Sequence, residues 1–243
     1  MSWVASSRIG ARRLIAIALL ATAGAAAADI LVVRSTGPSA KSFPPGKRLA
    51  PTARISLRAN DQLIVLDGRG TRAIRGPGTF TAGAAQGRSA SAAPATTSRA
   101  RIGAVRGPGT GTIRPPSIWH VDVSRSSAFC VAEPGKLTLW RADTTGAATA
   151  TITRTSDGAT RRLSWQGGES TAAWPADLPI ADGAQYRLSL GGSGAPTLLS
   201  FRTLSSRPAG LEDMASSLIR NDCTAQLDLL IDTVRLPETG TGN

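Results

Sequence analysis

Apolar and polar positions alternate differently along three stretches of the chain, and the first of these stretches predicts short strands. The apolar run at residues 30–33 predicts a buried strand. Residues 54–58 alternate apolar with polar side chains, as a half-buried strand does, and residues 62–66 form a second apolar run. Turn residues such as Asn60-Asp61 separate these segments. Short strands at this close spacing favour a small antiparallel sandwich or barrel over residues 29–82.

The second stretch alternates more regularly and predicts a larger β-domain. It contains about seven or eight apolar segments separated by about 8–12 residues, which is typical of an Ig-like β-sandwich over residues 116–204. Its clearest hairpin covers residues 148–166, with a turn at Ser156-Asp157-Gly158. Four tryptophans are expected in its core and at its rim rather than lining a ligand groove: Trp119, Trp140, Trp165 and Trp174.

The third stretch, residues 205–235, changes to helical spacing. Two sets of apolar residues each fall on one helix face: Leu211, Met214, Ala215, Leu218 and Ile219, then Leu227, Leu230, Ile231 and Val234. We expect a C-terminal two-helix hairpin with one face covering the sandwich. The alternative is an exposed helical pair that docks a partner. The chain is therefore predicted to be mainly β, with two β-modules and a helical pair.

Residues 1–28 have the composition of a secretory signal peptide. Arginines precede an apolar run of about twelve residues, too short for the ~20 residues of a membrane-spanning helix. Small residues at Ala26-Ala27-Ala28 place the expected cleavage before Asp29. We therefore expect a periplasmic protein of a Gram-negative bacterium, with no membrane span left after cleavage.

Export changes the interpretation of the two cysteines, Cys130 and Cys223. Oxidising compartments favour disulfides, so we expect these residues to form a bridge that clips the second helix to a strand. Two separate buried thiols are the alternative. Two cysteines also exclude a four-cysteine zinc site.

Charge is distributed unevenly over the chain, which carries 28 basic and 16 acidic side chains. Residues 29–115 hold 14 basic and three acidic side chains, whereas residues 116–243 hold 11 and 13. The first half could bind an anionic lipid or polymer of the envelope. Nucleic acid is not an expected partner, because only Phe43 and Phe80 lie among these charges.

A short repeat adds two candidate anion-binding residues. Arg75-Gly-Pro-Gly-Thr79 recurs as Arg106-Gly-Pro-Gly-Thr110. Arg75 and Arg106 could point at one anion, but two similar type II turns are the favoured interpretation. Residues 83–115, which contain the second copy, are rich in Ala, Ser, Thr, Pro and Gly and are expected to be a linker or loop.

The first β-module resembles a known family. Ile55-Ser-Leu-Arg-Ala-Asn-Asp-Gln-Leu-Ile-Val-Leu-Asp-Gly68, continuing to Thr71-Arg-Ala-Ile-Arg-Gly-Pro-Gly-Thr-Phe80, is similar to the periplasmic β-domain of FecR-like proteins. The resemblance covers about residues 29–82 and implies a β-rich domain for protein–protein signalling or assembly in the envelope. The chain shows neither the transmembrane helix nor the cytoplasmic segment of those regulators, so only the β-module carries over.

Residues that could carry chemistry are few. His120 is the single histidine, so His120 with Asp122 would be an incomplete metal site. Gly168-Glu-Ser-Thr-Ala172 resembles a nucleophile elbow but lacks the final glycine, so Ser170 is expected to be a loop serine. Leu236-Pro-Glu-Thr-Gly240 matches a sortase string but lies in an expected disordered tail, residues 236–243.

These observations favour a non-catalytic protein without cofactor or metal. We expect an exported interaction or sensory-accessory module of the bacterial envelope that binds a partner protein. The alternative is an electrostatic binder of an anionic envelope polymer through the Arg-rich first module.

Overall fold

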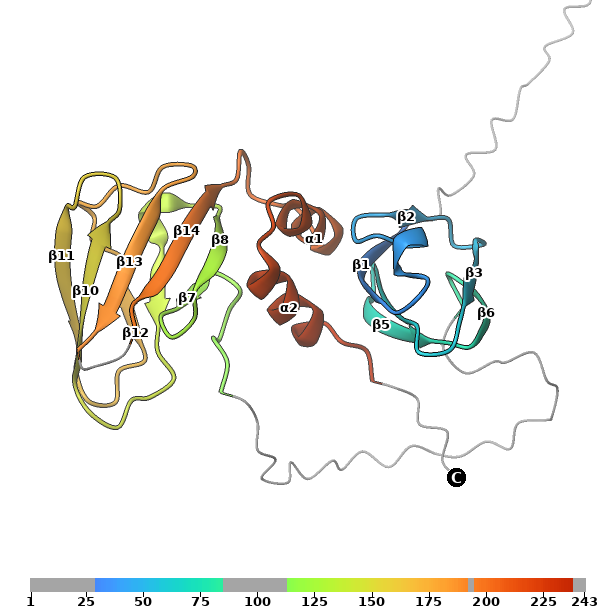
Figure 1. The fold of residues 1–243 in the computed structure, drawn as a ribbon, viewed down its shortest axis with the longest axis horizontal. Helices are drawn as coiled ribbons and strands as arrows, with labels where there is room; N and C mark the ends of the chain where they lie inside the picture. Colours follow the sequence, from blue (N-terminus) through green and yellow to red (C-terminus); the bar gives the residue numbers. More distant parts are fainter. Residues whose placement is uncertain (1–28, 85–112, 192–194, 238–243) are drawn as a thin grey trace, which may run out of the picture.

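The computed structural model of the protein describes residues 29–84, 113–191 and 195–237. It shows two β-modules at opposite ends of the molecule with two helices between them (Figure 1). The expected signal peptide, most of the linker, Arg106 and residues 238–243 lie outside the described residues. The prediction of a mainly β chain with a C-terminal helical pair is confirmed.

The first module pairs its short strands in two small sheets. The larger sheet has the order β2-β1-β4-β5 and the smaller one pairs β3 with β6. The elements are β1 (Ile30–Thr36), η1 (Ala40–Ser42), β2 (Arg48–Leu49), β3 (Arg54–Leu57), β4 (Gln62–Asp67), β5 (Gly70–Arg75) and β6 (Gly78–Thr81). Their shared core consists of Ile30, Val32, Leu49, Ile55, Leu57, Leu63, Val65, Ile74 and Ala82.

The larger sheet of this module is buried on both faces, which explains its unbroken apolar runs. Successive residues of a strand point to opposite faces. Ile30 and Val32 of β1 accordingly enter the core of the module, while Leu31 and Val33 pack with residues of the two helices. The same alternation occurs in β4. A four-stranded sheet at one end of the chain thus depends on a layer supplied from the other end.

The connection between β5 and β6 differs from the type II turn predicted for Arg75-Gly-Pro-Gly-Thr79. Gly78 already begins β6 with φ 151°, whereas a type II turn needs about +80° at that position. The Gly76–Pro77 peptide bond is cis. A Cβ atom on Gly76 would lie 2.1 Å from the carbonyl oxygen of Arg58, so close packing of the backbone requires glycine there.

The second module is a β-sandwich. A five-stranded sheet, β11-β10-β13-β14-β8, faces a three-stranded sheet, β12-β9-β7. The elements are β7 (His120–Asp122), β8 (Ser127–Val131), η2 (Pro134–Lys136), β9 (Thr138–Trp140), β10 (Ala148–Arg154), β11 (Thr160–Trp165), β12 (Thr171–Ala173), β13 (Gln185–Leu190) and β14 (Thr197–Thr203). The predicted hairpin at residues 148–166 is β10 and β11.

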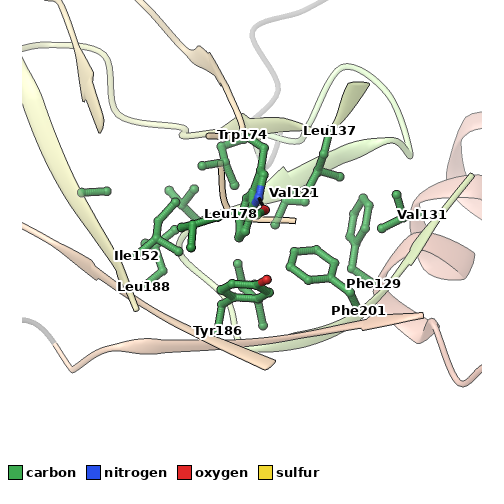
Figure 2. Packing of buried hydrophobic residues seen from close by; sticks show 14 of the residues in the cluster. Val121, Phe129, Val131, Leu137, Ile152, Trp174, Leu178, Tyr186, Leu188 and Phe201 are labelled. Atoms are coloured by element: carbon green, nitrogen blue, oxygen red, sulfur yellow. Dashed lines mark hydrogen bonds between the residues drawn. The ribbon is translucent and has the colours of Figure 1, made fainter. Parts of the chain in front are cut away.

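An aromatic cluster fills the middle of this sandwich (Figure 2). The ring of Trp174 lies edge-on to those of Tyr186 and Phe201, with centroids 4.9 and 5.2 Å apart. The hydroxyl of Tyr186, near the start of β13, donates a hydrogen bond of 2.6 Å to the carbonyl of Pro179. This bond matches the tyrosine corner of Ig-like domains. Trp165 and Trp174 belong to the core as predicted, but Trp119 packs toward the helices instead.

The two helices, α1 (Leu211–Arg220) and α2 (Thr224–Thr233), fill the space between the modules (Figure 1). Their predicted apolar faces form one cluster with residues of both modules: Leu31, Val33, Ile64, Leu66, Ile118, Cys130, Ala215, Leu218, Cys223, Leu227, Leu230 and Ile231. The expectation that the pair covers the sandwich is therefore incomplete. Its apolar surface contacts the first module as well, so the pair is a shared inner layer rather than an exposed docking element.

The chain after α2 is also fixed to the first module. Thr71 on β5 donates its backbone N–H to Val234 and its hydroxyl to Ile231, at 2.9 and 2.8 Å. Leu236 in turn donates its N–H to the carbonyl of Thr71 at 2.9 Å. A Cβ atom on Gly70 would lie 2.3 Å from the Val234 carbonyl oxygen, so this approach needs glycine. The expected disordered tail therefore does not include Leu236.

Candidate functional site

A disulfide joins the sandwich to the second helix. Cys130 on β8 and Cys223, immediately before α2, are fully buried and bonded to each other, which confirms the predicted pairing. The bridge spans a sequence separation of 93 residues. In the chain-entropy model a loop of this size stabilises the fold by about 4–5 kcal/mol. Disulfides persist in oxidising compartments, so the bridge fits a protein that functions outside the cytoplasm.

Beside the disulfide, one buried side-chain amide holds α2 against β8. Gln226 is 2% exposed, and its Oε1 accepts a 2.6 Å hydrogen bond from the N–H of Cys130. Its Nε2 donates to the carbonyls of Cys130 and Ile118 at 3.0 and 2.9 Å. Because β8 is the edge of the five-stranded sheet, the amide bonds to Cys130 as a neighbouring strand would. The disulfide and the amide together fix the angle between helix and sandwich.

A cavity lies at this fixed corner, between α2 and strands β7 and β8. It has a volume of about 260 Å³, and we call it the β8–α2 groove. Ile118, Phe129 and Leu229 contribute apolar wall, while His120 and Ser127 contribute polar groups. Ile113 also borders the groove with 69% of its surface exposed, which is high for an isoleucine. The groove is open to solvent and amphipathic.

Most charged groups that line the groove already have partners. Asp232 is paired with Arg114 and Arg235, and Asp228 is paired with Arg34 of the first module. Asp122 accepts hydrogen bonds from the backbone and hydroxyl of Ser124. Arg125 differs, because its guanidinium forms no ion pair within the described parts of the chain. A bound carboxylate would complete this arrangement.

The single histidine predicted as a weak ligand candidate belongs to this groove. His120 and Asp122 both line it, from β7. The Nδ1 atom of His120 is buried without a hydrogen-bond partner. Within residues 29–84, 113–191 and 195–237, no group of three or more His, Cys, Asp or Glu residues could hold a metal ion. The groove therefore offers an imidazole and a guanidinium as binding groups.

The candidate anion-binding residues are only partly described. Arg75 is exposed on β5 and borders a small crevice of about 40 Å³, which Arg235 and Thr71 also line. Arg106, the second member of the predicted pair, lies outside the described residues. Whether both arginines face one anion therefore remains a prediction.

Several arginines of the basic first module are used internally. Arg34 pairs with Asp228 on α2, and Arg48 pairs with Glu212 on α1. Arg72 is 6% exposed and pairs with Asp67. Burial by itself would raise the pKa of Asp67, but hydrogen bonds from Arg69 and Arg72 outweigh burial and lower it. Some of the arginines that make the first half of the chain basic thus form ion pairs with the two helices.

Ser170, the serine of the incomplete nucleophile elbow, takes part in the backbone hydrogen bonding of the sandwich. Its carbonyl accepts the backbone N–H of Arg141, at 2.9 Å. The buried guanidinium of Arg141 donates to the carbonyls of Glu169, Gly146 and Gln166 and lies 5.7 Å from the ring centre of Trp165. This arginine, which sequence analysis missed, organises the loops around Ser170.

Comparison of the sequence with models of protein families gave no match, and a search of curated proteins gave none either. Across the part of the chain that the structure describes, no helix is both long and apolar enough to cross a membrane.

Proposed function

We propose that this protein is an exported, non-catalytic interaction or sensory-accessory module of the bacterial envelope, and that it binds a partner protein in the β8–α2 groove. The observation that carries the proposal is an open, amphipathic groove at a corner fixed by the Cys130–Cys223 bridge and by Gln226. A site on a rigid corner loses little conformational entropy when a partner binds.

The size of the groove favours a polypeptide side chain over a small-molecule ligand. Its volume of about 260 Å³ is below the ~300–1,000 Å³ that is typical of small-molecule sites. Apolar wall from Phe129 and Leu229 suits an aliphatic or aromatic anchor, and exposed Ile113 extends the apolar contact. Arg125 adds a charge that has no ion-pair partner among the described residues. The partner therefore presents an apolar side chain close to a carboxylate.

Two further observations support an envelope location. The signal-like composition of residues 1–28 favours export, and a buried disulfide is typical of oxidising compartments. The strand–turn–strand order of residues 29–82 agrees with the resemblance to FecR-like β-domains, which implies a role in signalling or assembly.

The experiment that tests the proposal is site-specific photo-crosslinking in envelope extract of the source bacterium. A photoreactive amino acid replaces Ala225 at the groove in one variant and exposed Arg54 on the first module in a matched control. We expect a discrete adduct of one mass from position 225 and none from position 54.

A second variant distinguishes binding in the groove from non-specific binding. Filling the groove by Ser127→Trp, with the photoreactive residue still at position 225, should remove the adduct while the thermal unfolding midpoint stays within a few degrees. An adduct that persists in the filled variant, or that forms equally from position 54, would contradict the proposed docking site.

A further inference from the structure

Three exposed arginines lie on the outer face of the five-stranded sheet, which α2 covers at its β8 edge. Residues such as Ile152, Leu188 and Phe201 point into the sandwich core, so their neighbours in each strand point outward. Arg162 on β11, Arg187 on β13 and Arg202 on β14 are outward and exposed. Strand register places Arg162 opposite Thr151, and Arg187 opposite Thr153. We call this surface the arginine face.

The arginine face has one sign of charge, although residues 116–243 as a whole are slightly acidic. The five strands β8, β10, β11, β13 and β14 contain no Asp or Glu. None of Arg162, Arg187 and Arg202 forms an ion pair with a described residue. Arginines elsewhere on the same hairpin are paired, Arg154 with Asp157 and Arg161 with Asp177. The unpaired charge is thus concentrated on the outward side.

Hydroxyl and amide groups fill the surface between these arginines. The outward residues are Thr149, Thr151, Thr153, Thr160, Ser164, Gln185, Ser189 and Ser200. The hydroxyls of Thr153 and Thr160 lie 3.2 Å apart across β10 and β11, which confirms that they share this side. Neighbouring strands are ~4.8 Å apart and residues rise ~3.4 Å along a strand, so consecutive arginines are about 12 and 14 Å apart.

The chemistry of this face disfavours two classes of partner. Protein-binding hot spots combine arginine with large aromatic side chains, and the only large apolar side chain at the described outward positions is Leu198, which is 44% exposed. Single-stranded nucleic acid needs aromatic side chains for base stacking, and none points outward here. Arginines that alternate with hydroxyl and amide groups suit an extended polymer that carries both acidic groups and hydroxyls.

We propose that the arginine face binds an acidic polysaccharide. Guanidinium groups on Arg162, Arg187 and Arg202 pair with carboxylates or other acidic groups of the polymer, and the Thr, Ser and Gln side chains exchange hydrogen bonds with its sugar hydroxyls. This site is separate from the β8–α2 groove and independent of the proposed partner protein. It also places anion binding on the second module, whereas charge composition alone favoured the first.

The test uses residues 29–243 with the disulfide formed and polygalacturonate as the acidic polysaccharide. The triple variant Arg162→Gln, Arg187→Gln, Arg202→Gln is compared with a control of equal net charge, Lys41→Gln, Arg54→Gln, Arg58→Gln, whose residues are exposed on the first module. We expect the triple variant to weaken binding about tenfold and to flatten its salt dependence, and the control to change affinity about twofold or less.

Two further probes decide the chemistry. Neutral dextran should not bind, and polyglutamate, which has carboxylates but no hydroxyls, should bind more weakly than polygalacturonate. Equal affinity for polyglutamate would overturn the polysaccharide assignment. Equal weakening by the control variant would overturn the location, because binding would then follow net charge. Unchanged circular dichroism and unfolding midpoints of both variants exclude misfolding as the cause.

Discussion

The two β-modules differ in what covers their sheets. In the sandwich, the five-stranded sheet packs against a second sheet of the same module around the core near Tyr186 and Phe201. In the first module, the second face of the four-stranded sheet is covered by α1 and α2, which follow more than a hundred residues later. The first module is therefore completed by the C-terminal helices, whereas the sandwich supplies its own core and contacts the helices at the β8 edge of its five-stranded sheet.

The two modules are also attached to the helical pair by different contacts. The helical pair is fixed to the sandwich by the Cys130–Cys223 bridge and Gln226, and to the first module by apolar contact and the hydrogen bonds of Thr71. It therefore contacts both modules and connects them. The β8–α2 groove lies beside this joint, so a partner bound there would contact α2, on which the first module depends.

The largest expected effect comes from removing the disulfide. Replacing both cysteines by alanine should lower the free energy of unfolding by about 4 kcal/mol, because the loop between Cys130 and Cys223 is long. Denaturant titration with fluorescence and circular dichroism measures this loss. The control is Ser205→Ala with Ser206→Ala, both exposed. A loss below about 1 kcal/mol would show that α2 is held by other contacts.

A somewhat smaller effect is expected at Gln226. Gln226→Leu keeps the volume but leaves the N–H and carbonyl of Cys130 and the carbonyl of Ile118 buried without partners. The expected loss is about 2–3 kcal/mol, compared with ~0.5 kcal/mol or less for the exposed control Gln185→Leu. Thermal and denaturant unfolding check both values. Equal effects of the two variants would mean that the buried amide does not hold the joint.

The pH dependence of the first module gives a weaker and more local test. Burial by itself raises the pKa of Asp61, but hydrogen bonds from Ser39 and Arg58 outweigh burial, so its pKa lies below the ordinary 3.8. A lowered pKa stabilises the folded state above pH 3.8, and this stability is lost as the pH falls through the folded value. Asp61→Asn should therefore reduce the acid sensitivity of β1 and β4, measured by hydrogen exchange between pH 5 and 2.5. An unchanged acid profile would contradict this assignment.

The smallest effects are expected from the ion pairs that join the first module to the helices. The side chains of Arg34–Asp228 and Arg48–Glu212 are 35–53% exposed, so each pair should contribute about 0.2–1 kcal/mol and less at high salt. Double-mutant cycles at 50 mM and 500 mM NaCl measure both terms. A coupling above about 2 kcal/mol would mean that charge, rather than apolar contact, is the main link.

Sequence patterns predicted the local elements well. The Asp-Gly turn at 157–158 predicted the β10–β11 hairpin, and Gly158 indeed adopts a positive φ of 72°. The apolar run at residues 30–33 predicted a buried strand, and the presence of only two cysteines in the chain favoured the Cys130–Cys223 bridge. The strand and hairpin predictions succeed because backbone geometry constrains them locally.

Contacts between segments that are far apart in the sequence could not be predicted from local patterns. The run at residues 30–33 indicates burial on both faces, but nothing in it identifies residues 211–233 as the covering layer. Arg141 and Gln226 are buried, and their side chains form hydrogen bonds with backbone groups of segments that lie far away in the sequence, which composition cannot show. The prediction of a type II turn at residues 75–79 was wrong. The backbone of Gly76 packs closely against the carbonyl of Arg58, and this long-range contact outweighs the local turn preference.

The most direct measurement of the central claim is native-state hydrogen exchange on residues 29–243 at increasing denaturant. If the C-terminal helices complete the first module, amides of β1 and β4 should never have a higher opening free energy than those of α2, while amides of β10 and β13 should open independently. Amides of β1 and β4 that stay protected after those of α2 have exchanged would contradict the account, because the first module would then hold its fold without the helices.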